Sequence, residues 1–173
     1  MAAARPIKQK YLAVDTNVLL DLAAGDDDAL GAIKSVRQRI PGIIIRVVPT
    51  VIQELAYLSE QDDDRRVRSL ATTALQSLVS KWKFEPVGLI AVGHGITDLL
   101  AKEIRARGLL PEAEVNDSLI IAESALADCM LLLSSDAHMR NIAAEELATL
   151  LIRKDVSHLL VQSPRQVCKK FGA

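Results

Sequence analysis

The sequence has few aromatic residues, few cysteines and no excess of either charge, and each shortage argues against a class of protein. Aromatic residues make up 3% of the 173 positions, which disfavours binding of single strands by stacking platforms. The two cysteines, Cys129 and Cys168, lack the spacing of a zinc site or a disulfide framework, which favours a reducing compartment. The net charge of −1 gives no bulk signal for nucleic acid or membrane surfaces, so a polyanion would have to meet a local patch.

Long apolar runs are also missing. No window reaches the roughly 18 uninterrupted apolar residues of a membrane span, and the basic N-terminus is not followed by the apolar stretch of a signal peptide. We therefore expect a cytoplasmic protein with no membrane contact. Half of the residues are apolar, which suits one compact domain. We assign it to residues 11–173, after an N-terminal tail of residues 1–10.

Apolar runs and helical periodicity alternate along the chain. Runs typical of doubly buried strands occupy residues 11–14, 43–48, 83–87, 130–133 and 159–161. Helical patterns, with Thr50 and Ser163 as expected N-caps, occupy residues 29–40, 50–58, 65–82, 95–107, 113–127, 137–152 and 164–171. This alternation predicts a single three-layer α/β domain with a parallel, roughly five-stranded sheet flanked by helices.

The stretch YLAVDTNVLLDL, residues 11–22, places a charged residue between two apolar segments. The first apolar run stops at Asp15, and apolar residues resume at Val18. A buried, uncompensated carboxylate is costly, so Asp15 has to be hydrogen-bonded, paired with a cation or bound to a metal. In open α/β sheets, ligands bind beyond the carboxyl ends of the strands, where Asp15 is expected. A purely structural role as an N-cap is the alternative.

Three further acids occupy comparable places. Asp136 follows the fourth strand-like run just before a helix, Asp117 borders the apolar stripe of a later helix, and Glu54 lies one turn into the helix after the second strand. Such carboxylates can converge only around a positive charge, because they otherwise repel each other. Oxygen ligands without His or Cys favour Mg²⁺ or Mn²⁺ over zinc. Taken singly, capping or a solvated helix surface explains each of them.

Other charged clusters have simpler explanations. The acid runs 26–28 and 62–64 each precede a predicted helix, where negative charge meets the positive end of the helix dipole. Contacts to a nucleic-acid backbone would have to come from basic clusters, for which solvated helix faces are the alternative explanation. The candidates are Arg65, Arg66, Arg68, Lys81, Lys83, Lys102, Arg105 and Arg107.

Taken in order, the acidic motifs resemble the PIN domain family, metal-dependent ribonucleases that include the VapC-type toxins. The resemblance extends from about residue 11 to residue 171. Its motifs are a strand ending in Asp15-Thr16-Asn17, Glu54 early in the helix after the second strand, Asn116-Asp117 at the start of an Ala-rich helix, and a strand leading through Ser134-Ser135 to Asp136.

The chain departs from the family pattern in three places. Ser134 and Ser135 stand where many relatives have Thr followed by a polar residue, and Ala137 replaces a common aromatic residue. Extra helical sequence around residues 65–80 and 145–152 makes the chain longer than compact toxin members. The extra length weakens the toxin assignment more than the nuclease assignment.

The resemblance implies a PIN-like domain and a Mg²⁺- or Mn²⁺-dependent endoribonuclease that hydrolyses phosphodiester bonds in RNA. Asp15, Asp117 and Asp136 would hold the metal ions, and Glu54 would complete the metal-binding, catalytic cluster and orient the attacking water. Glu114, one helical turn before Asp117, is a lower-ranked outer ligand. The supporting shell would consist of Thr16, Asn17, Asn116, Ser134 and Ser135.

The resemblance also bears on partners. It implies an RNA substrate, and it allows an antitoxin protein and a second copy of the chain as partners without requiring either. The open alternative is a catalytically inactive PIN scaffold that acts as a protein or RNA interaction module. Two other classes fit poorly: a haloacid dehalogenase phosphatase needs a second Asp where Asn17 stands, and a receiver domain needs a Lys that the late stretch LLVQSPRQ lacks.

Overall fold

Five parallel strands form the central sheet of the computed structural model, which describes residues 9–88 and 93–172. Their order in the sheet is β3-β2-β1-β4-β5. The strands are β1 (Tyr11–Val14), β2 (Ile44–Val47), β3 (Glu85–Pro86), β4 (Cys129–Leu133) and β5 (Leu160–Gln162). All five lie within two residues of the runs predicted from the sequence. Of the predicted N-terminal tail, residues 1–8 lie outside the described residues.

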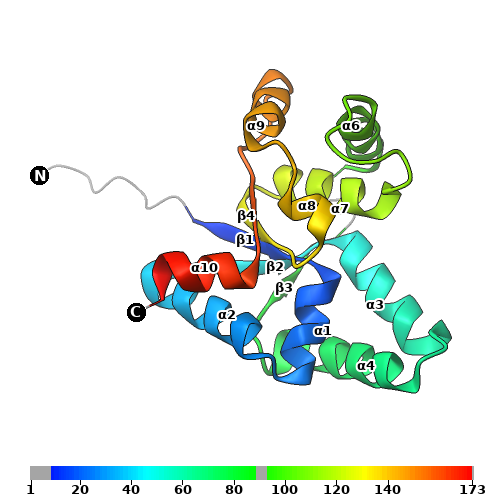
Figure 1. The fold of residues 1–173 in the computed structure, drawn as a ribbon, viewed down its shortest axis with the longest axis vertical. Helices are drawn as coiled ribbons and strands as arrows, with labels where there is room; N and C mark the ends of the chain where they lie inside the picture. The colour runs from blue at the N-terminus through cyan, green and yellow to red at the C-terminus, as the bar shows by residue number, and fades with distance from the viewer. Residues whose placement is uncertain (1–8, 89–92, 173) are drawn as a thin grey trace, which may run out of the picture.

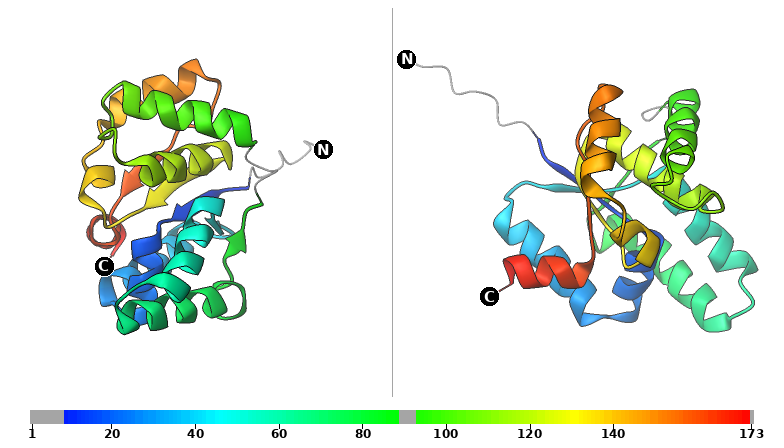
Figure 2. Two further views of the ribbon diagram at one scale, coloured as in Figure 1. Left: turned by 90° about the vertical axis from the view of Figure 1, so that its right-hand side faces the viewer. Right: turned by 45° about the horizontal axis from the view of Figure 1, so that its top comes forward.

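Helices cover both faces of this sheet (Figures 1 and 2). Right-handed crossovers require this arrangement, because the chain moves in one direction across the sheet up to β3 and in the other after it. One layer holds α1 (Thr16–Ala24), α2 (Asp27–Arg39), α3 (Pro49–Gln61), α4 (Arg65–Ser80) and α10 (Pro164–Phe171), which packs on α2. The other holds α6 (His94–Ala106), α7 (Val115–Leu126), α8 (Ala137–Arg140) and α9 (Ala144–Arg153).

The order of strands reverses at β1, which pairs with β2 on one side and β4 on the other. Val14 and Leu133 are register partners at the ends of β1 and β4. The pairing continues past both strand ends, since the Asp15 N–H donates to the Leu133 carbonyl at 2.9 Å and the Ser134 N–H donates to the Gln162 carbonyl at 3.0 Å. The backbone therefore fixes the segments that leave β1 and β4 side by side.

The predicted fold class is confirmed: the chain is an α/β domain with a five-stranded parallel sheet between helical layers. The central strand is fully enclosed, with Leu12, Ala13 and Val14 each 0% exposed, as the continuous apolar run predicts. Ser163 caps α10 through a capping box with Gln166, and Asp26 and Asp64 cap α2 and α4. Among the described residues, none of the helices is long and apolar enough to cross a membrane.

One helix was missed and one helical prediction needs correction. The segment after Asp15 forms the helix α1, in which the buried residues Val18, Leu19 and Leu22 have helical spacing. The helix expected over residues 137–152 is divided into α8 and α9. Met139 and Ile142 are both buried at this break, and Glu145 and Glu146 lie in the first turn of α9, where acidic residues favour a new helix start.

The N-cap predicted at Thr50 is also wrong. The helix α3 begins at Pro49, with Val48 in the capping position and no side-chain capping bond. Proline suits the first helical position because its missing N–H would have had no partner there. Thr50 instead lies inside the first turn and binds a carboxylate on α7.

Candidate functional site

The four acids singled out in the sequence share one environment at the carboxyl ends of β1 and β4. Asp15 follows β1, Asp136 follows β4, Asp117 lies in the first turn of α7, and Glu54 lies near the start of α3. Burial raises the pKa of Asp117 to about 7, and repulsion from Asp15, Asp136, Glu114 and Glu54 adds to this increase. The sequence separates these groups widely, and the sheet brings their charges together.

Asp15 is a buried carboxylate held by neutral donors. Its side chain accepts hydrogen bonds from the Thr16 N–H at 2.6 Å, the Asn17 amide at 2.9 Å and the Ser134 hydroxyl at 2.6 Å. Burial nevertheless raises its pKa to about 6, because Asp15 is only 4% exposed, and repulsion from Glu54 and Asp136 adds to the effect of burial. Asp15 therefore caps α1 and also contributes negative charge to the acidic site.

Glu54 is half-buried and bound at both carboxylate oxygens. The Thr16 hydroxyl donates to Oε2, and the Asn116 amide donates to Oε1 at 2.8 Å. These two donors come from α1 and α7, so they fix a side chain of α3 against two other elements. Thr16 and Asn116 therefore restrict the orientation of the Glu54 carboxylate.

One carboxylate oxygen of Asp136 accepts hydrogen bonds from the first backbone N–H groups of the helix that follows it. Its Oδ1 accepts from the His138 N–H at 2.7 Å and the Met139 N–H at 3.0 Å, which makes Asp136 the N-cap of α8. The Asp136 N–H donates to the Ser134 hydroxyl at 3.1 Å, and the Ser135 N–H donates to the Asn17 side chain at 3.0 Å. Asp15 and Asp136 thus each cap a helix and also belong to the acidic site.

Asp117 differs from the other three acids because its carboxylate has no hydrogen bond or ion pair within residues 9–88 and 93–172. It is half-buried, so its charge is desolvated without compensation. Glu114, one turn earlier, lies on the rim of the site, where its carboxylate contacts Nδ1 of His138 at 3.1 Å. Asp117 is therefore the member of the cluster that most needs a positive charge.

The donor set fits a hard divalent cation. All four groups offer oxygen, and none forms an ion pair with Lys or Arg in the described part of the chain. In that part, no three or more His, Cys, Asp and Glu side chains are grouped so that they could hold a metal ion by themselves. Mg²⁺ usually keeps several waters and needs few direct carboxylate contacts. The raised pKa values of Asp15 and Asp117 are the physical reason a cation would be favoured there.

Glu123 is a further residue of the site region that the sequence interpretation missed. It lies on α7, is 3% exposed, and accepts from the Thr50 N–H at 3.0 Å and the Thr50 hydroxyl at 2.8 Å. Burial raises its pKa, while the bonds from Thr50 act in the opposite direction. Glu123 thus places a carboxylate at the N-terminus of α3, the helix that carries Glu54. Its signal in the sequence was a charge within the apolar stretch IIAESALA.

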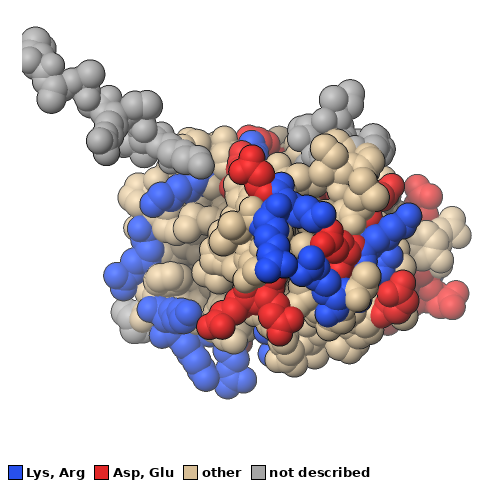
Figure 3. Space-filling model, turned by 90° about the horizontal axis from the view of Figure 1, so that it is seen from above, with Lys and Arg blue, Asp and Glu red and all other residues tan. Residues whose placement is uncertain are grey.

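Two of the basic residues considered for substrate binding have structural roles. Arg105 is largely buried and donates to the Ser118 hydroxyl, which ties α6 to α7. Arg107 and Lys154 both pair with Glu103. Figure 3, which views the end of the molecule formed by α6 and α9, shows Lys and Arg interspersed with Asp and Glu over its centre and right side, and Lys and Arg without acidic neighbours along its lower left edge.

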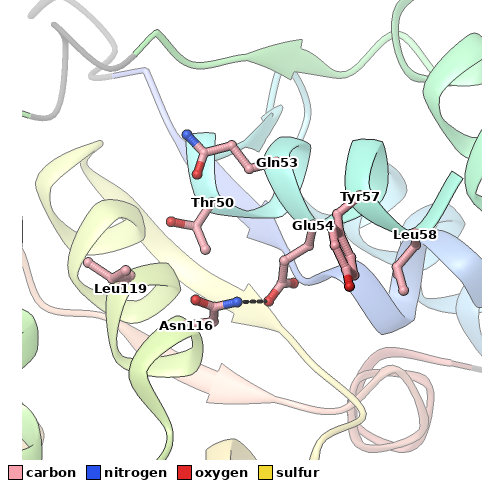
Figure 4. A pocket seen from close by; sticks show the side chains of 7 residues that line it. All are labelled: Thr50, Gln53, Glu54, Tyr57, Leu58, Asn116 and Leu119. Atoms are coloured by element: carbon pink, nitrogen blue, oxygen red, sulfur yellow. Dashed lines mark hydrogen bonds between the residues drawn. The ribbon is translucent and has the colours of Figure 1, made fainter. Parts of the chain in front are cut away.

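A pocket of about 420 Å³ opens beside the acidic site, with Glu54 in its wall (Figure 4). Its other described lining residues come from α3 and α7. Tyr57, Leu58 and Leu119 provide apolar surface, and Gln53, Thr50 and Asn116 provide polar groups. The site therefore combines a carboxylate cluster with an adjoining cavity large enough for a small organic group.

Metal-free stability should decrease as the pH rises from about 4 to 7. The pKa values of Asp15 and Asp117 are higher in the folded chain than their ordinary value, so the folded state binds more protons in this window. We expect a fall in melting temperature of about 2–4 °C in EDTA, measured by circular dichroism. The fall should be smaller in Asp117→Asn and in Mg²⁺, and a melting temperature that rises across this window would contradict the electrostatic interpretation.

The fold and site define a PIN-like α/β domain with an acidic cluster at the strand ends. No protein-family model matches the sequence, and comparison with curated proteins finds no significant match. Among solved structures, the chain is similar to one in the crystal structure of VapBC2 from Rickettsia felis bound to a DNA fragment from their promoter. The match has a TM-score of 0.58 and 15% identity, and it covers 88% of this chain and 98% of that one. At this identity the likeness establishes the fold alone.

Proposed function

We propose that the chain is a metal-dependent endoribonuclease that hydrolyses phosphodiester bonds in RNA. The observation that carries the proposal is the shared environment of Asp15, Glu54, Asp117 and Asp136, in which no Lys or Arg of the described residues compensates the four charges. The PIN-like fold supports the same conclusion, because Asp15 and Asp136 follow β1 and β4 at the point where the strand order reverses. An RNA substrate also agrees with the cytoplasmic location expected from the sequence.

In this proposal Asp15, Asp117 and Asp136 would hold one or two Mg²⁺ or Mn²⁺ ions. Such an ion, when bound, supplies an activated water and neutralises charge on the phosphate and the leaving oxygen. Asn17 and Ser134 hold the Asp15 carboxylate in one orientation through their hydrogen bonds.

Glu54 would complete the cluster and orient the attacking water. The bonds from Thr16 and Asn116 limit the rotation of its carboxylate, which favours one direction of approach for that water. Ser135 would act further out, because its N–H fixes the Asn17 side chain that in turn binds Asp15.

We also propose that the nuclease is the toxin of a toxin–antitoxin pair. The support is the similarity of fold to a chain of VapBC2, a complex solved with a fragment of promoter DNA. A small DNA-binding protein encoded by the neighbouring reading frame would be the antitoxin, and a second copy of this chain would be a further partner. Co-purification of the two proteins, with loss of nuclease activity in the complex, would support this assignment.

Cleavage of single-stranded RNA should depend on a divalent ion. We expect cleavage of a labelled RNA in Mg²⁺ or Mn²⁺ and its loss in excess EDTA, followed by recovery when Mn²⁺ is restored. The same titration should raise the melting temperature, because a ligand that binds the folded state stabilises it. Cleavage that persists in EDTA would overturn the proposal, and RNA binding without cleavage in Mn²⁺ would favour an inactive interaction module.

A further inference from the structure

The pocket beside Glu54 contains the most exposed aromatic side chain of the chain. Tyr57 is 65% exposed, whereas Trp82 and Phe84 are buried and Phe171 is 36% exposed at the far end of α10. The ring of Tyr57 lines the pocket together with Leu58 (Figure 4), and its exposure leaves much of the ring accessible to a ligand. An exposed aromatic ring next to a cavity is the arrangement on which a flat ring can stack.

The polar groups of the pocket can recognise the edge of a ring. The amides of Gln53 and Asn116 each carry a donor and an acceptor. The nitrogen of Asn116 is used by Glu54, and Figure 4 shows the amide oxygen of Asn116 turned away from that bond. Gln53 is exposed and makes no bond to the other lining residues drawn in Figure 4.

The charge of the pocket favours binding of a neutral nucleobase over binding of a phosphate group. None of its seven described lining residues is a Lys or Arg, and one of them is the carboxylate Glu54. A phosphate would be repelled, whereas a neutral heteroaromatic ring would find apolar walls, a stacking surface and amide groups. The bases of single-stranded RNA are such rings, and their edges are free to be hydrogen-bonded.

We propose that this pocket binds one nucleobase of the RNA, next to the phosphodiester at the acidic site. Tyr57 stacks on the base, and the Gln53 amide and the Asn116 carbonyl bind its edge. The proposal rests on the proposed ribonuclease function and names the part of the substrate recognised beside its centre. Because Asn116 also donates to Glu54 at 2.8 Å, a base in the pocket is coupled to a carboxylate of the site through one side chain.

Nucleosides are the appropriate probe because they carry a base without a phosphate. We would titrate adenosine, guanosine, cytidine and uridine into the full chain in EDTA and follow the side-chain amides of Gln53 and Asn116 by NMR. The expected result is saturable shifts at these amides with unequal affinities for the four nucleosides. Ribose 5-phosphate, which lacks a base, should give no such shifts, and equal binding of ribose 5-phosphate would overturn the proposal.

Substitutions in the pocket separate stacking from edge recognition. Tyr57→Ala should weaken nucleoside binding about tenfold, and Tyr57→Phe should retain it, since stacking of a base on an aromatic ring contributes about this much. Gln53→Ala should alter the order of affinities among the four nucleosides. Phe171→Ala is the matched control and should have no effect, because Phe171 lies on α10 away from the pocket. Unchanged affinity in Tyr57→Ala would overturn the proposal.

The nucleoside titration distinguishes failure of this inference from failure of the nuclease proposal. Neither metal nor cleavage is needed for a nucleoside to bind. If nucleosides bind at Gln53 and Tyr57 but RNA is never cleaved, the base pocket stands and the nuclease proposal fails. If RNA is cleaved in Mn²⁺ while no nucleoside shifts these amides and Tyr57→Ala leaves KM unchanged, the nuclease stands and the base pocket is wrong.

Discussion

Replacing Asp117 by Asn should lower cleavage of single-stranded RNA about a hundredfold or more, because even residues that only support metal ligands cost ten- to a hundredfold when changed. The same substitution should leave the metal-free melting temperature unchanged or raise it. The Asp117 carboxylate is desolvated, repelled by the other carboxylates and without a hydrogen bond in the described residues, so Asn removes an unfavourable charge and no favourable contact.

Asp117 gives a sharper test than Asp15 or Asp136. Asp15 accepts three hydrogen bonds and Asp136 caps α8, so an amide at either position would disturb donors as well as charge. The matched control is Glu60→Gln, which removes an exposed charge from α3 beyond the pocket and should preserve cleavage. A melting temperature several degrees below the parent, or full activity in Asp117→Asn, would contradict the electrostatic account of the site.

Replacing Glu123 by Ala should lower the free energy of unfolding by about 1–3 kcal/mol, because the buried Thr50 N–H and hydroxyl would lose their acceptor. In a chain of this size, each kcal/mol corresponds to about 2–4 °C in melting temperature. The first turn of α3 would also lose its fixed position, so we expect slower RNA cleavage through displacement of Glu54. Urea denaturation and the cleavage rate of the same samples measure the two effects.

Two variants test whether the Thr50 contact is the cause. Glu123→Gln keeps one acceptor and should be less damaging than Glu123→Ala. Thr50→Val removes the hydroxyl, and its effect should be smaller in the Glu123→Ala background than in the parent, because the two residues share one interaction. Strictly additive effects of Thr50→Val and Glu123→Ala would show that the contact contributes little to stability.

Most elements of the fold could be predicted because their signals are local. The run of residues 11–14 coincides with β1, and Ser163 followed by Pro164 predicts the start of α10. Caps and apolar periods depend on neighbours within one or two turns, so a single sequence contains them. The helix α1 was overlooked, and the break between α8 and α9 was not predicted.

The sequence was enough to select the acidic residues of the candidate site, but it was less informative about the contacts between residues there. An acid directly after a buried strand is visible from neighbouring residues, which is why Asp15 and Asp136 could be selected. The contact between Thr50 and Glu123 joins residues 73 positions apart, and local patterns assigned Thr50 a capping role it does not have. The placement of Tyr57, Gln53 and Asn116 around one cavity likewise depends on how α3 meets α7.

By itself, the sequence determined the strands and most of the helices of this chain, and that certain acids stand where strands end. Hydrophobic period and capping chemistry act over short distances and need no knowledge of the rest of the molecule. Only the tertiary structure decided that β1 and β4 are neighbours and that four carboxylates lie close enough to repel one another. It also decided that a buried glutamate holds α3 in place, since charge repulsion, burial and hydrogen bonding depend on distances through space that chain separation does not fix.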